Sequence, residues 1–81
     1  MKLFNLKEKD EATIDLLSKD LEVVRRLQSL GIRVGQNIRL LKKAPFSGPY
    51  LIEDISTGAK IAADKKIVRE IEVTKIEKKK L

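Results

Sequence analysis

The chain has 81 residues, of which 42% are hydrophobic and only 4% aromatic, so it can build one small domain around an aliphatic core. It contains no Cys and no His, which excludes disulfides, thiolate nucleophiles, imidazole bases and the usual zinc ligands, and so argues against an enzyme. Its formal net charge of +6 suits an anionic partner such as nucleic acid, an anionic membrane surface or an acidic protein.

The first predicted element is a strand over residues 12–16, where apolar and polar residues alternate. The side chains expected on its two faces are Ala12, Ile14 and Leu16 on one, and Thr13, Asp15 and Leu17 on the other. Ser18 and Lys19 then lead into a turn, so the strand should end before them.

A helix of about three turns is predicted over residues 21–30. Asp20 is its natural N-cap, because its carboxylate can accept hydrogen bonds from the first backbone N–H groups. Gly31 follows at the position where a left-handed residue ends many helices, and Ile32 would pack back on Leu27. The apolar stripe expected to face the core consists of Leu21, Val23, Val24, Leu27 and Leu30.

The remainder of the chain alternates short strands with turns. Further strands are predicted over residues 38–41, 50–55, 59–63 and 70–76, with a helical turn near residues 64–68. Asp64 is the expected cap of that turn. The fold class is therefore mainly β: about five short strands and one inserted helix at about residues 20–30 predict a small, closed or nearly closed barrel.

We expect residues 1–76 to form a single domain and residues 77–81 to be a basic, disordered tail. No apolar run approaches the roughly 20 residues that span a bilayer, and charged residues interrupt the N-terminal stretch where a secretory signal would be apolar. The expectation is a soluble, cytoplasmic protein. The start at Met1 and the complete barrel predict that it stands alone.

The most distinctive segment is the loop around residues 42–50, which places two cations beside an aromatic residue and two prolines. In one interpretation Phe46 anchors a partner, and the cations steer an acidic surface toward it. In the other, Phe46 folds over the open end of the barrel and the prolines only stiffen the turn. The sequence leaves both open. The candidate contact residues are Lys42, Lys43, Ala44, Pro45, Phe46 and Pro49.

Basic residues of the helix extend this candidate site. Arg25 and Arg26, with Arg33 shortly after the helix, would form a patch with the loop lysines. Arginine is a good phosphate ligand; the alternative is a solvated helix face. A nucleic-acid interface normally adds aromatic platforms for base stacking, and the only aromatic residues are Phe4, Phe46 and Tyr50. Nucleic-acid binding is therefore the weaker alternative.

The acidic residues show no metal-binding or catalytic pattern. None has the alternating spacing of a cation-binding loop, and the adjacent Glu53 and Asp54 would point to opposite faces of a strand. The 4 glycines are spread over separate turns instead of forming a phosphate-binding loop. We therefore expect no metal site, no cofactor and no acid–base pair.

The chain resembles the FeoA family, the small accessory proteins of ferrous-iron uptake, in the segments LQSLGIRVGQNI over residues 27–38 and KAPFSGP over residues 43–49. The order continues with a hairpin glycine at Gly58, an apolar strand, a helical turn and a closing strand. One departure is Lys9 followed by Asp10, which stand where the family often has a glycine turn.

This resemblance implies an SH3-like β-barrel with residues 21–30 as an inserted helix, no catalysis, and a partner in the FeoB-type membrane permease for Fe(II). The same fold forms the C-terminal domain of DtxR-type metal-dependent repressors, so a stand-alone domain of the metal-regulator type is an alternative.

Our hypothesis is a regulatory module that docks on the cytosolic part of the permease, at the inner face of the membrane, and modulates transport. The loop residues Ala44, Pro45, Phe46 and Pro49 would form the apolar centre of the contact. Lys42, Lys43, Arg25 and Arg26 would form its steering rim. Self-association through an exposed edge strand is a further expectation.

Overall fold

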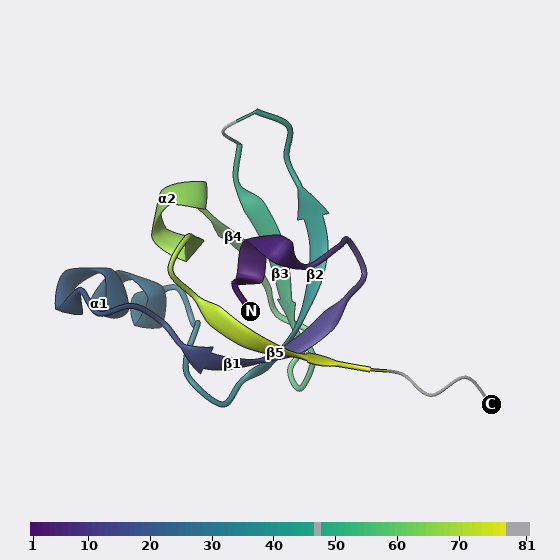
Figure 1. Ribbon diagram of the computed structural model, residues 1–81, viewed down its shortest axis with the longest axis horizontal. Coiled ribbons are helices and arrows are strands. Elements are labelled where there is room, and N and C mark those ends of the chain that lie inside the picture. Colours follow the sequence, from purple (N-terminus) through teal and green to yellow (C-terminus); the bar gives the residue numbers. More distant parts are fainter. Residues whose placement is uncertain (47, 78–81) are drawn as a thin grey trace.

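The computed structural model describes residues 1–46 and 48–77, and Figure 1 shows how their elements are arranged. In chain order the elements are η1 (Leu3–Asn5), β1 (Glu11–Leu16), α1 (Leu21–Ser29), β2 (Asn37–Lys43), β3 (Tyr50–Asp54), β4 (Lys60–Ala63), α2 (Lys65–Val68) and β5 (Glu72–Ile76). Apart from Glu77, the tail predicted to be disordered lies outside the described residues.

The five strands form one sheet in the order β4-β3-β2-β1-β5, and all neighbours are antiparallel. The pairing shifts register between Leu40 and Lys42 in β2 and between Ile14 and Leu16 in β1. Such bulges bend and twist strands, which lets a short sheet curl around its own core. The prediction of a mainly β, SH3-like fold with one inserted helix is confirmed.

The shift in β1 corrects one expectation about the core. Ala12 and Ile14 are buried as expected, but Leu16 is 37% exposed and Leu17 only 3% exposed. Strict alternation would place Leu16 inside. Because the bulge changes which face each following residue takes, Leu17 occupies the buried place instead.

The N-terminal segment belongs to the core, which the sequence pattern did not show. Leu3, the first residue of the short η1 turn, and Leu6, which follows the turn, are completely buried. The carbonyl of Met1 accepts the N–H of Val73 at 2.7 Å, and the N–H of Leu3 donates to the carbonyl of Ile71 at 2.9 Å. These residues therefore cover the side of β5 that β1 leaves open, which protects an edge strand.

Helix α1 begins and ends as its sequence predicts. The carboxylate of Asp20 accepts the N–H of Glu22 at 2.9 Å. Gly31 has a φ of +93°, the N–H of Ile32 donates to the carbonyl of Leu27 at 2.9 Å, and the N–H of Gly31 donates to that of Gln28 at 3.0 Å. This is the Schellman arrangement.

The predicted apolar stripe of α1 is wider than the stripe that the structure buries. Leu27 is the single residue of the helix that is fully buried, whereas Leu21 is 61% exposed and Leu30 is also exposed. The helix packs along α2 and extends away from the sheet, as Figure 1 shows. A helix held at one side of a small barrel buries only a narrow stripe.

A buried polar pair holds together the turns at one end of the barrel. The side-chain amide of Gln36 donates to Asp54 Oδ2 at 2.7 Å and to the carbonyl of Gly31 at 2.9 Å. Asp54 Oδ1 accepts the N–H and the hydroxyl of Ser56 at 2.9 and 2.8 Å. These hydrogen bonds, the one from Gln36 above all, lower the pKa of Asp54 to about 2.

Candidate functional site

The β2–β3 hairpin carries the loop that the sequence singles out. Lys43 pairs with Tyr50 at its base, and the N–H of Ala44 donates to the carbonyl of Pro49 at 3.1 Å. The N–H of Gly48 donates to the carbonyl of Pro45 at 3.2 Å. Figure 1 shows that the hairpin projects well beyond the body of the barrel. The paired strands β2 and β3 thus hold the loop out in the solvent.

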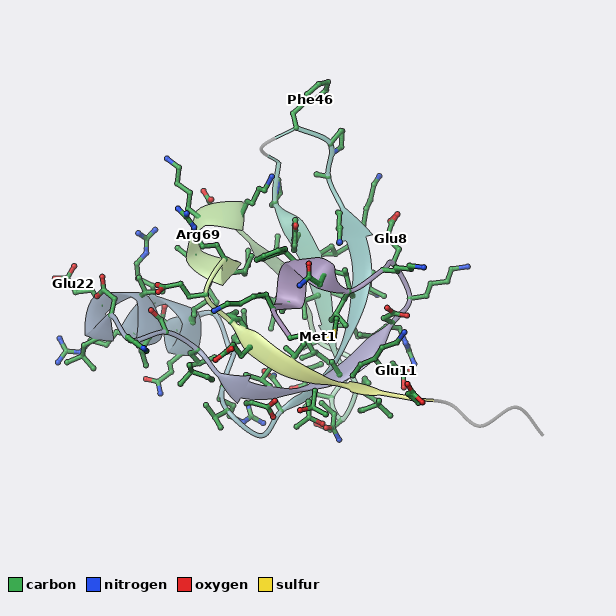
Figure 2. All side chains as sticks on the ribbon, in the orientation of Figure 1. Met1, Glu8, Glu11, Glu22, Phe46 and Arg69 are labelled. Carbon is green, nitrogen blue, oxygen red and sulfur yellow. The ribbon has the colours of Figure 1, made fainter. Side chains whose placement is uncertain are left out.

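Phe46 is the outermost side chain of this loop. It is 94% exposed, and Figure 2 shows its ring pointing away from the molecule. Its φ is +63°, a left-handed conformation that costs a residue with a Cβ about 1–2 kcal/mol. Of the two interpretations of Phe46, the one in which it covers the open end of the barrel is wrong.

The two loop lysines differ in their surroundings. The ammonium of Lys43 donates to the carbonyl oxygen of Phe4 at 2.6 Å and lies 5.9 Å from the centre of the Tyr50 ring. Lys43 therefore ties the base of the hairpin to η1. Lys42 is exposed. Of the two, Lys42 is thus the one available for steering a partner.

Arg25 and Arg26 are exposed on α1. Figure 1 shows α1 and the tip of the hairpin pointing in different directions, with α2 placed between them in that view. The structure therefore keeps the helix arginines and the loop residues on separate projections of the fold.

A pocket that sequence reasoning missed lies beside η1 and α2. It has a volume of about 620 Å³ and is lined by Phe4, Asp64, Lys65, Lys66 and Arg69. No local signal joins Phe4 to the other four, because they are separated by most of the chain. One feature of the sequence indicates the basic part of this pocket, namely the run of cations that follows the helix cap Asp64.

The carboxylates of Glu11 and Glu53 serve the fold. Arg39 donates to Glu11 Oε2 at 2.6 Å and to Glu53 Oε1 at 2.7 Å, which links three neighbouring strands. The hydrogen bond from Arg39 to Glu11 raises the pKa of Arg39, and the charges of Glu11 and Glu53 add to this. Within residues 1–46 and 48–77 there is no cluster of three or more metal-ligating side chains.

None of the helices in the described part of the chain is long and apolar enough to cross a membrane.

The curled five-stranded sheet with its inserted helix and its projecting aromatic hairpin defines the class of small SH3-like barrel modules. The FeoA domain model matches residues 1–75, and the chain belongs to the FeoA family. This family is non-enzymatic in kind, and membership supports a role in ferrous-iron uptake. A comparison with curated protein sequences finds no match.

Solved structures share this fold. An iron uptake regulatory protein, FeoA, has 22% identity and a TM-score of 0.81, with 94% of this chain and 97% of that chain covered. The FeoA protein from Chlorobium tepidum has 26% identity and a TM-score of 0.80, with 99% and 74% covered.

The fold also occurs as part of longer proteins. A manganese-dependent transcriptional repressor in complex with manganese has 23% identity and a TM-score of 0.84. The match covers 94% of this chain but 36% of the repressor, so the likeness concerns about a third of that protein.

Proposed function

We propose that this protein is an accessory module of ferrous-iron uptake that binds the cytosolic part of an FeoB-type permease and modulates transport. It would work in the cytoplasm, at the inner face of the membrane. The observation that carries the proposal is Phe46, an aromatic residue at the end of a projecting hairpin with almost its entire surface in water.

Two local costs meet at Phe46 without any gain in packing. Its ring exposes apolar surface to solvent, and its backbone holds the left-handed conformation. Both costs would be offset if the ring enters a pocket of a partner, since buried aromatic anchors dominate many interfaces. In this exposed position the ring adds no packing energy to the folded barrel.

The neighbours of Phe46 suit the same contact. Pro45 and Pro49 stiffen the loop, which reduces the entropy lost on binding. Lys42 is exposed and would steer an acidic surface toward the loop, whereas Lys43 holds the hairpin in place. Arg25 and Arg26 would reach a partner along α1, as a second contact.

The test is the affinity of the purified chain for the detergent-solubilised permease from the same source, measured at physiological salt. Phe46→Ala should weaken binding by about tenfold or more, a loss of roughly 1.4 kcal/mol or more. The control is Val34→Ala, because Val34 is also an exposed apolar residue, 59% exposed, outside the hairpin. Equal affinities of Phe46→Ala and the unaltered protein would exclude this loop as the anchor.

Salt dependence separates the proposal from nucleic-acid binding. Binding to phosphates loses several decades of affinity as salt rises to physiological levels, whereas an apolar contact loses much less. Absence of permease binding, together with salt-sensitive binding to duplex DNA, would favour the nucleic-acid alternative.

A further inference from the structure

The pocket beside η1 and α2 combines an aromatic ring with three cations. Phe4 is 43% exposed, so part of its ring remains in contact with solvent. Lys65, Lys66 and Arg69 line the same cavity. The one carboxylate of the lining is Asp64, and its Oδ1 already accepts the N–H of Lys66 at 2.8 Å. The pocket is therefore positive and offers an apolar surface to a ligand.

The cations of this pocket are left without acidic partners within the described residues. The ion pairs there join Arg39 to Glu11 and Glu53, and Lys75 to Asp10. None of them involves the cations of the pocket. Three cations gathered around an exposed ring repel one another, and an incoming anionic group would relieve that repulsion.

One hydrogen bond joins the pocket to the base of the hairpin. The ammonium of Lys43, on β2, donates to the carbonyl oxygen of Phe4 at 2.6 Å. In Figure 2 the labelled Phe46 lies at the tip of the hairpin, and the labelled Arg69 lies below it, beside α2. A partner that takes up Phe46 and extends to the base of the hairpin would therefore reach the pocket.

We propose that this pocket binds an acidic segment of the partner protein that carries an apolar side chain. The inference rests on the proposed function and names the chemistry that the permease must present. The apolar side chain would pack on the ring of Phe4, while flanking carboxylates pair with Lys65, Lys66 and Arg69. At about 620 Å³ the cavity is large enough for more than one side chain.

Two other occupants fit less well. A lipid headgroup would pair with the cations, but a polar headgroup in this concave site would make no apolar contact with the exposed ring of Phe4. A second copy of this chain would bring a net charge of +6 toward a positive pocket, and like charges across an interface suppress association.

The experiment compares two charge reversals, Arg69→Glu and Arg33→Glu. Both arginines are exposed, and both substitutions change the net charge by the same amount. Arg33 lies in the loop between α1 and β2, which runs along the bottom of Figure 1, away from the hairpin tip. The probe is a short fluorescent peptide with one Phe flanked by Glu residues, titrated with the full chain and followed by anisotropy.

Arg69→Glu should weaken binding of this peptide by about tenfold or more, and Arg33→Glu by about twofold or less. Replacing the peptide's Phe by Gly, or Phe4 by Ala in the protein, should weaken it by a similar factor to Arg69→Glu. Amide signals of residues 4 and 64–69 should shift in NMR spectra when the peptide is added. Lys43 bonds to the main chain of Phe4, so the Ala variant keeps that hydrogen bond.

Equal losses for the two arginine variants would reduce the effect to non-specific attraction and overturn the inference. Stronger binding to vesicles of anionic phospholipid than to the peptide would assign the pocket to a membrane surface instead. If Arg69→Glu leaves permease affinity unchanged while Phe46→Ala lowers it, the proposed function stands and this inference fails. If the permease does not bind but the peptide does, the proposed function fails, and the pocket keeps its affinity for acidic, apolar segments but loses the permease as its partner.

Discussion

The backbone N–H of Lys9 donates to the carbonyl oxygen of Leu40 at 2.6 Å from a left-handed conformation with a φ of +76°. The turn is closed on both sides, because the N–H of Leu40 donates to the carbonyl of Asp10 at 2.9 Å and the N–H of Lys7 donates to the Asp10 carboxylate at 2.9 Å. A glycine would adopt this positive φ without the steric cost that the Cβ of Lys9 carries.

Lys9→Gly should therefore stabilise the protein. It removes the penalty for a Cβ at positive φ, about 1–2 kcal/mol, and adds about 0.5–1 kcal/mol of backbone entropy to the unfolded chain. The expected net gain is about 0.5–1 kcal/mol, seen as a higher Tm in a thermal melt. Lys9→Ala is the control, since it removes the same side chain but keeps the Cβ; equal melting temperatures for the two would contradict the account.

Gly31→Ala should destabilise the end of α1. Gly31 has a φ of +93°, and a Cβ built there would lie 3.7 Å from Ile61 Cδ1, which is ordinary van der Waals contact. The cost is therefore conformational and amounts to about 1 kcal/mol. Asn tolerates this conformation better than Ala, so Gly31→Asn should lose less. A melt of the Ala variant that matches the unaltered protein would remove the Schellman ending as a source of stability.

Lowering the pH should reduce the Tm of the protein, partly through protonation of Asp54. Its pKa is lowered from 3.8 to about 2, so the ionised form stabilises the native state above pH 3.8 and that contribution disappears as the pH falls toward 2. Asp54→Asn should flatten this part of the curve of Tm against pH. It should not flatten it fully, because the backbone hydrogen bond from Lys7 also lowers the pKa of Asp10. An unchanged slope between pH 4 and 2 would rule out Asp54 as a contributor.

Phe46→Gly separates binding from stability. The substitution removes an exposed ring and also the strain of a Cβ at a φ of +63°. We expect a Tm equal to or above that of the unaltered protein, together with the loss of permease binding predicted for Phe46→Ala. A marked drop in Tm would show that the ring stabilises the fold. It would count against a role of the loop in partner binding alone.

Local rules predicted most elements of the fold. Asp20, Gly31 and Asp64 act on backbone groups within a few residues, so their roles at helix ends can be read from the sequence. The burial of Leu17 in place of Leu16 could not be read, because it depends on a bulge set by pairing with a distant strand. The burial of Leu3 depends likewise on a distant segment, because its N–H donates to the carbonyl of Ile71, just before β5.

The candidate site also has one part that the sequence predicts and one part that it does not. The exposed loop around Phe46 stands out by composition, since two cations, two prolines and an aromatic residue lie together in sequence. The pocket of Phe4 and Arg69 does not, because only the folded barrel brings the first turn of the chain to α2. Residues far apart in sequence that share a surface leave no periodic pattern.

The pairing of the first residues with β5 also shapes how the protein folds. The amino group of Met1 donates to the carbonyl of Val73 across 72 positions of the chain. Contacts of such long range form only after a large loop has closed, and domains rich in them fold in milliseconds to seconds although helical proteins of similar size take microseconds to milliseconds. During synthesis the barrel therefore cannot close this edge until β5 has been made. A chain stopped before β5 would expose the apolar sides of β1 and of the N-terminal turn to aggregation.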